Sequence, residues 1–183
     1  MLGLQSEIAG MKFEHPCNKH PTGPKKPNID VMLSLADGSV VAIESKFTEP
    51  FGSGKRSLAE KYFKDQLWLK QRLPACQRLA DAMRESWFHL DTPQLLKHML
   101  GLAHEYPDGK CTLLYLWFDP QTEEAADHAN EVARLEREIA GDRIQFVAKT
   151  YQQAFALAPA SAVRQHRDYF RYMLDRYGLK TGR

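Results

Sequence analysis

The sequence predicts a single α/β domain in which a mixed β-sheet is flanked by α-helices. Three observations support this prediction: two adjoining strand-like runs near the N-terminus, a later apolar run typical of a central strand, and helix-forming segments between and after them. A chain of 183 residues is the size of one domain with a full hydrophobic core. We therefore expect one domain over residues 1–183.

The first elements along the chain are a loop and a β-hairpin. Residues 15–28 are rich in proline and lysine, which predicts a loop. The next two runs, IDVMLSL (29–35) and SVVAIESKF (39–47), predict two strands joined by a short turn. This hairpin is the strongest local signal in the chain.

The later elements alternate between helix and strand. Ser57-Leu-Ala-Glu60 is a capping box, which predicts a helix over 58–73. Thr92 as N-cap and Pro93 in the first turn predict a helix to about residue 104. The remaining expectations are helices over 75–88, 123–140 and 161–178, a central strand over 111–118, and a strand over 143–151.

Composition narrows the class of protein. Hydrophobic residues make up 43% of the chain and charged residues 26%, as in a soluble globular protein. No apolar run approaches the roughly 20 residues that span a bilayer, and residues 1–15 lack a secretory signal pattern, so we expect no membrane partner. Cys17, Cys76 and Cys111 are widely spaced, which favours free thiols and a cytoplasmic location. The net charge of +2 does not by itself indicate nucleic-acid binding.

The register of the hairpin decides whether its acidic residues meet. In one register, residues 37–38 form a two-residue type I′ turn, and Asp30 then faces away from Glu44. In the other register, residues 36–37 form a type I turn and Gly38 is a left-handed bulge residue, which places Asp30 directly opposite Glu44.

The hydrophobic pattern favours the second register, because a slip of one residue sends a whole strand's side chains to the other face. This register gathers the apolar side chains of Ile29, Val31, Leu33, Leu35, Val41 and Ile43 on one face. The other face carries Asp30 opposite Glu44, with Lys46 two residues further along the second strand. A charged surface coat is the structural alternative, although Met32, Val40 and Ala42 on this face indicate that it is partly covered.

These three residue types suit phosphodiester hydrolysis. Opposed carboxylates repel unless a cation lies between them, and carboxylate, carbonyl and water oxygens form the octahedral shell of Mg²⁺. Asp30 and Glu44 are therefore candidate ligands of Mg²⁺ or Mn²⁺. The ammonium of Lys46 would orient the attacking water or offset developing phosphate charge.

The pattern of Asp30, thirteen intervening residues and Glu44-Ser45-Lys46, with Pro27 shortly before it, resembles the PD-(D/E)XK nuclease superfamily. The match covers residues 27–49 well. The resemblance implies a restriction endonuclease-like fold, a mixed β-sheet flanked by α-helices. It also implies metal binding by Asp30 and Glu44, and a role for Lys46 in positioning the nucleophile. Pro27 departs from the pattern, because two residues separate it from Asp30.

The resemblance also implies accessory residues. Many relatives carry a glutamine on the helix that follows the second motif strand, and Gln94 is preferred over Gln66 because its helix leads directly to the strand at 111. An acidic residue on a first helix would correspond to Glu7, in a short helix around Leu4 to Ala9. A plain surface position is the alternative for each of them.

The leading functional prediction is a Mg²⁺-dependent endonuclease acting on DNA, in restriction or repair. Lysines 19, 25, 26 and 55 and Arg56 bracket the motif and are candidate phosphate contacts. The alternatives are a non-catalytic nucleic-acid- or partner-binding module on the same fold, and a small α/β protein whose charged hairpin is only surface. Restriction-like enzymes often dimerise, so a homodimer is a further open expectation.

Overall fold

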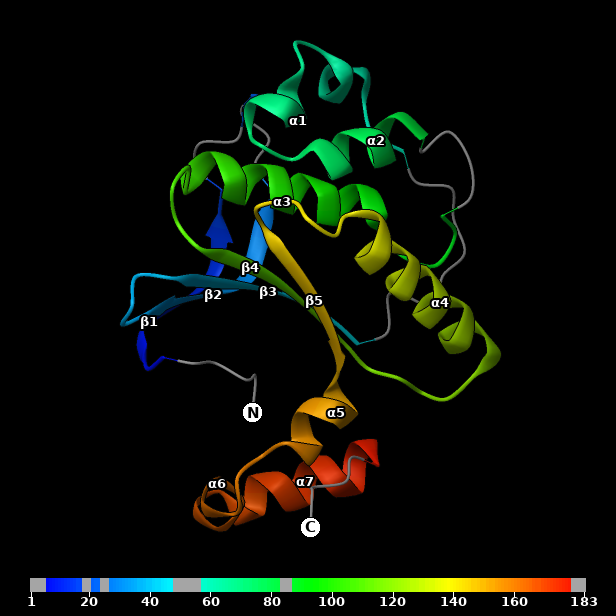
Figure 1. Ribbon diagram of the computed structural model, residues 1–183. Coiled ribbons are helices and arrows are strands. Elements are labelled where there is room, and N and C mark those ends of the chain that lie inside the picture. Colours follow the sequence, from blue (N-terminus) through cyan, green and yellow to red (C-terminus); the bar gives the residue numbers. More distant parts are fainter. Residues whose placement is uncertain (1–5, 18–20, 24–26, 48–56, 83–86, 179–183) are drawn as a thin grey trace.

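The computed structural model describes residues 6–17, 21–23, 27–47, 57–82 and 87–178. Within them the chain forms a five-stranded mixed sheet in the order β1-β2-β3-β4-β5, with helices on both sides (Figure 1). The strands are β1 (Ile8–Pro16), β2 (Asn28–Leu35), β3 (Val40–Lys46), β4 (Cys111–Trp117) and β5 (Gln145–Thr150). β1, β2 and β3 are antiparallel neighbours, whereas β3, β4 and β5 run parallel. The predicted fold class is confirmed, and the run at 111–118 is an inner strand.

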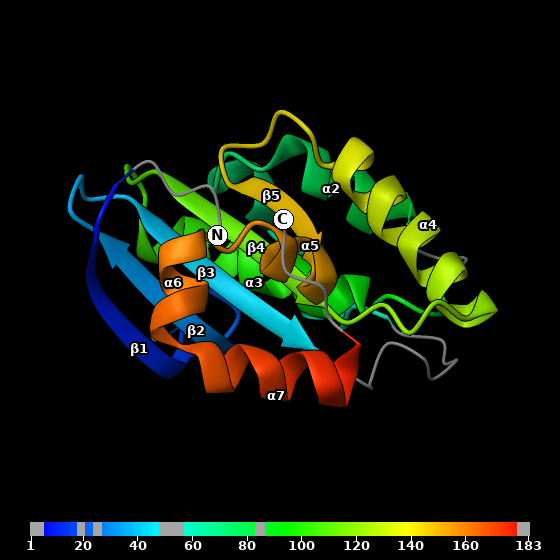
Figure 2. The same ribbon diagram turned by 90° about the horizontal axis from the view of Figure 1, so that it is seen from below.

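The helices form two groups on opposite sides of the sheet (Figures 1 and 2). The first group is η2 (Glu60–Phe63), α1 (Leu67–Lys70), α2 (Pro74–Ala82), α3 (Thr92–Glu105) and α4 (Glu123–Glu138). The second group is α5 (Tyr151–Ala156), α6 (Ala160–Gln165) and α7 (Arg167–Tyr177). No helix in the described ranges is both long enough and apolar enough to cross a membrane.

The hairpin register is the one that the hydrophobic pattern favoured. Val31 pairs with Ile43 and Leu33 with Val41. The turn closes as expected, because the Gly38 N–H donates to the Leu35 carbonyl at 3.0 Å. Gly38 has a φ of 80°, the left-handed bulge conformation that a glycine adopts without strain.

Both faces of the sheet are packed, and the more deeply buried face is the one that carries Glu44. A smaller apolar cluster lies on the other face and contains Leu33, Leu35, Val41, Ile43 and Leu114. The larger cluster joins the Glu44 face to α3 and α4 and includes Met32, Val40, Ala42, Leu96, Met99, Leu113, Val132 and Leu135. Ile29 was expected in the smaller cluster but belongs to the larger one, at the start of β2 where it pairs with His15 of β1.

The N-terminal segment is a strand, so the short helix expected around residues 4–9 is wrong where the structure describes it. β1 pairs with β2 through Met11 with Leu33 and Phe13 with Val31. The alternation of apolar and charged residues in MKFEH is the period of a strand, and pairing along β2 satisfies its backbone groups.

The helix predicted over 58–73 is also wrong, because tertiary packing overrides the local capping pattern. η2 has no side-chain cap, and Asp65 and Gln66 take left-handed conformations with φ of 58° and 53°. The interruption lets Trp68 become fully buried, with its indole N–H donating to the Tyr62 carbonyl at 2.7 Å. Burial of a tryptophan outweighs the small helix propensities of a few residues.

Two further helix predictions need adjustment. The N-cap of α3 is Asp91 rather than Thr92, and its carboxylate accepts the Gln94 backbone N–H at 3.0 Å. The tail is two helices, α6 and α7, that meet at His166, with α5 before them. Gly178 is the C-cap of α7 with a φ of 61°, which agrees with the predicted helix end at residue 178.

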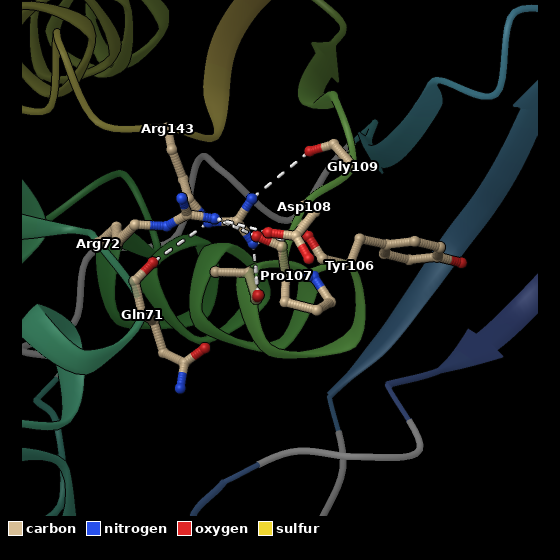
Figure 3. A network of polar contacts seen from close by, with 8 residues as sticks. Gln71, Arg72, Tyr106, Pro107, Asp108, Gly109 and Arg143 are labelled. Atoms are coloured by element: carbon tan, nitrogen blue, oxygen red, sulfur yellow. Dashed lines mark hydrogen bonds and ion pairs between the residues drawn. The ribbon is translucent and has the colours of Figure 1, made fainter.

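Arg143, just before β5, fixes the C-terminal end of α3 (Figure 3). Its guanidinium donates to the carbonyls of Ala103 and Tyr106 in α3 and its cap, and to those of Gln71 and Gly109. A cation at this position complements the unpaired carbonyls and the negative end of the helix dipole. α3 is therefore held firmly over the sheet.

Candidate active site at the carboxyl end of β3

The side chain of Asp30, near the start of β2, reaches the end of β3. The Ser45 backbone N–H donates to Asp30 Oδ2 at 2.7 Å. Glu44 and Lys46 flank Ser45, and Lys46 Nζ lies 2.7 Å from Glu44 Oε1. The antiparallel hairpin therefore brings all three predicted residues to one end of the sheet.

Glu44 is buried where α3 covers β3. Its side chain is 1% exposed, and His98 Nε2 of α3 lies 3.1 Å from Glu44 Oε2. Burial acts to raise the pKa of Glu44, but contact with His98 and then with Lys46 outweighs it and leaves this pKa below its usual value. The buried Glu44 side chain is therefore an ionised carboxylate and not a neutral carboxylic acid.

Asp30 has the opposite shift. Burial raises the pKa of its carboxyl, the Ser45 N–H opposes that rise, and the nearby charge of Glu44 adds to it. Two carboxylates therefore share this region and their charges repel. A cation between them would relieve the repulsion.

The donor chemistry of the site suits a hard divalent ion. Both Glu44 oxygens lie at ion-pair distance from a cationic or imidazole nitrogen, yet neither has a partner of hydrogen-bonding geometry among the described residues. These residues also hold no group of three or more His, Cys, Asp or Glu side chains that could bind a metal ion. Zn²⁺ takes three or four protein ligands, whereas Mg²⁺ takes one or two carboxylates and keeps several waters. Asp30 and Glu44 could hold Mg²⁺ or Mn²⁺ in this way.

Aromatic side chains fix the strand ends beside the site. Phe47, just after β3, stacks on Phe118 with ring centroids 5.4 Å apart and contacts Tyr151 and Tyr177 at 4.5 and 5.1 Å. The Tyr151 hydroxyl lies 2.7 Å from Ser45 Oγ. Burial raises the pKa of Tyr151, so its hydroxyl stays neutral near pH 7. The second helix group thereby holds the backbone that carries Glu44 and Lys46.

The predicted accessory residues have different places. Gln94 lies in the first turn of α3 and is partly buried. Gln66 is an exposed residue before α1. Glu7 lies at the turn end of the hairpin, where its carbonyl accepts the Ala36 N–H, so roughly 20 Å of strand separates it from Asp30. The structure does not bring Glu7 to the site.

Two site residues escaped the sequence reasoning, His98 and Tyr151. His98 is four residues after Gln94 on the same face of α3, so its contact with Glu44 lies one turn further along the helix that carries Gln94. Tyr151 had no sequence signal, because its contact with Ser45 crosses 106 positions. The basic residues at 19, 25, 26, 55 and 56 lie outside the described residues.

A comparison with protein families complements this geometry. A family model described as "Restriction Endonuclease associating with ARP" matches residues 1–178, nearly the whole chain. No curated protein and no solved structure matches the chain.

Proposed function

The chain belongs to the family of restriction endonucleases associating with ARP, and on this premise we propose that it is a Mg²⁺-dependent endonuclease that hydrolyses DNA phosphodiester bonds. Membership gives the chain a nuclease-related role and agrees with its restriction endonuclease-like α/β fold. The proposal adds the metal, the substrate and the catalytic residues.

One observation carries the proposal: two carboxylates and an ammonium converge where a strand of the sheet ends. Asp30 reaches Ser45 at 2.7 Å, and Lys46 reaches Glu44 at the same distance. The Lys46 side chain is 19% exposed, so it contacts the buried Glu44 carboxylate and also reaches the surface where a substrate would arrive. A solvated charged coat, the alternative from the sequence, does not account for a Glu44 that is 1% exposed.

Each residue has a role that its environment supports. Asp30 and Glu44 would hold Mg²⁺, which when bound polarises the phosphate and lowers the pKa of a water. Lys46 would orient the attacking water and place positive charge near the phosphate oxygens. The buried α3 side of Glu44 excludes water, which strengthens these electrostatic interactions.

A cleavage assay tests the proposal. Plasmid and genomic DNA, which together offer many sequence contexts, are incubated with purified protein and Mg²⁺ or Mn²⁺. The wild type should cut, EDTA should stop it, and Asp30→Ala and Lys46→Ala should each lower the rate by at least about 100-fold. Asp37→Ala and Lys110→Ala are matched controls. Asp37 lies in the turn of the hairpin and Lys110 lies directly before β4, so both are at the end of the sheet opposite to the proposed site.

The outcomes separate the candidate functions. Cutting that both site variants abolish and both controls retain supports the enzyme. DNA binding without cutting in either metal supports the non-catalytic module. If Asp30→Ala and Lys46→Ala cut as fast as the wild type, the assigned residues are wrong.

A further inference from the structure

His98 is a buried polar residue whose position the assigned catalytic set does not explain. It lies in the middle of α3 with a side chain that is 1% exposed. Buried polar groups nearly always have hydrogen-bond partners, because an unsatisfied buried group destabilises the fold. Here Nδ1 has no hydrogen-bond partner among the described residues, and Nε2 faces Glu44 Oε2 at 3.1 Å.

The chemistry of the two groups fixes the direction of their contact. An ionised carboxylate only accepts hydrogen bonds, so the ring nitrogen that faces it must carry a hydrogen. His98 Nε2 is that nitrogen. The contact distance is right but its angle falls outside hydrogen-bonding geometry, a looseness that is common in catalytic sites before substrate or metal binds.

We propose that His98 is a positioning residue, whose Nε2–H holds Glu44 Oε2 so that Oε1 faces Lys46 and a bound Mg²⁺. The inference rests on the proposed function and names the residue that fixes one of its ligands. The two Glu44 oxygens then have different tasks: Oε2 is held by α3, and Oε1 lies 2.7 Å from Lys46 Nζ. Groups that orient a metal-binding carboxylate change metal affinity or activity by about 10–100-fold when they are lost.

The helix that carries His98 is rigid enough for this task. Asp91 caps its first turn, and Arg143 donates to carbonyls at its C-terminal end. The apolar residues near His98 in α3 are fully buried, each at most 1% exposed: Leu96, Met99, Leu100 and Leu102. A side chain held by packing on a capped helix is a precise support for a ligand.

The test measures Mn²⁺ binding to the full chain by electron paramagnetic resonance, without DNA and without turnover. His98→Leu removes the N–H donor and fills its place in the core with an apolar side chain. His98→Gln keeps an N–H near the position of Nε2. His128→Leu and His128→Gln are the matched controls, because His128 is equally buried but contacts Tyr115 instead of Glu44.

We expect His98→Leu to weaken Mn²⁺ binding by about 10-fold or more, and His98→Gln to restore most of the affinity. Both His128 variants should bind Mn²⁺ as the wild type does, although they lower thermal stability. Equal weakening by His98→Leu and His98→Gln, or wild-type affinity in His98→Leu, would overturn the positioning role. A wild type that binds no Mn²⁺ overturns it as well.

The same proteins in the DNA-cleavage assay distinguish the two proposals. Weaker Mn²⁺ binding in His98→Leu with recovery in His98→Gln, in a protein that cuts no DNA, supports the positioning role and ends the nuclease proposal. Unchanged Mn²⁺ binding in His98→Leu, in a protein that cuts DNA, ends the positioning role and leaves the nuclease intact.

Discussion

Asp30 Oδ2 accepts the backbone N–H of Ser45 at 2.7 Å, so an acidic side chain continues the ladder of β2 and β3. The last backbone pair that joins these strands is Val31 with Ile43. Beyond it the Asp30 carboxylate supplies the acceptor for β3. One carboxyl oxygen of Asp30 therefore holds the strand that carries Glu44 and Lys46.

Asp30→Asn should separate stability from activity. The asparagine oxygen still accepts the Ser45 N–H, so the strand contact survives. Because burial and Glu44 raise the pKa of Asp30, the fold gains stability below that pKa and loses it as the pH rises through it. Removing the charge should thus leave the metal-free melting temperature at pH 7 equal to or above that of the wild type, while DNA cutting falls by at least about 100-fold.

Asp37→Asn gives the opposite sign and is the control for that measurement. Hydrogen bonds from Ser39 lower the pKa of Asp37, so its ionised form stabilises the fold, and this contribution is lost as the pH falls through the lowered pKa. The variant should melt slightly below the wild type at pH 7 and still cut DNA. A large loss of stability in Asp30→Asn would contradict the assigned contact.

The buried pair of Tyr115 and His128 should make the protein sensitive to acid. The Tyr115 hydroxyl lies 3.0 Å from His128 Nε2, and burial lowers the pKa of His128 from 6.5 to about 4. The unfolded chain binds this proton more readily, so stability falls as the pH falls from 6.5 towards 4. Between pH 7 and pH 5 His128 should cost about 2 kcal/mol, measured by urea unfolding.

His128→Gln removes the titrating group and should flatten that part of the pH profile. Its unfolding free energy at pH 7 should be lower than that of the wild type, because the contact with Tyr115 is weakened. The difference between the two proteins should then shrink at pH 5. An unchanged slope in the variant would show that other groups control the acid response.

Arg143→Ala should lower stability strongly without touching the site residues. It leaves several carbonyls around the end of α3 without a donor, which should cost about 2–4 kcal/mol in urea unfolding. Arg72→Ala is the control, because Arg72 is 63% exposed and its pair with Asp108 is worth at most about 1 kcal/mol. Equal losses of stability in the two variants would contradict the role of Arg143 at the C-terminal end of α3, which Figure 3 shows.

Mg²⁺ should stabilise the wild type by mass action. A ligand that binds only the folded state adds about 2.7 kcal/mol when its concentration is 100 times its dissociation constant. At this protein's size, each kcal/mol raises the melting temperature by about 2–4 °C. The shift should disappear with EDTA and in Asp30→Asn. An equal shift in Asp30→Asn would place the metal elsewhere.

The sequence predicted the fold best where local patterns and tertiary packing agree. The alternation of apolar residues in the hairpin and Gly38 in its turn set the register, and the apolar run at 111–118 predicted an inner strand. The prediction failed over 58–73, where the burial of Trp68 broke a helix that the capping pattern favoured. It also failed at β1, whose short alternating segment was assigned to a helix by the resemblance.

By itself, the sequence determined that Asp30, Glu44 and Lys46 share one face of a hairpin, because strand periodicity and a single turn relate residues only 16 positions apart. Only the tertiary structure decided that Glu44 is buried, that His98 meets it from α3, and that Tyr151 holds Ser45. Those contacts join segments 54 and 106 positions apart, and no local period encodes which helix residue will face a given strand once the core has packed.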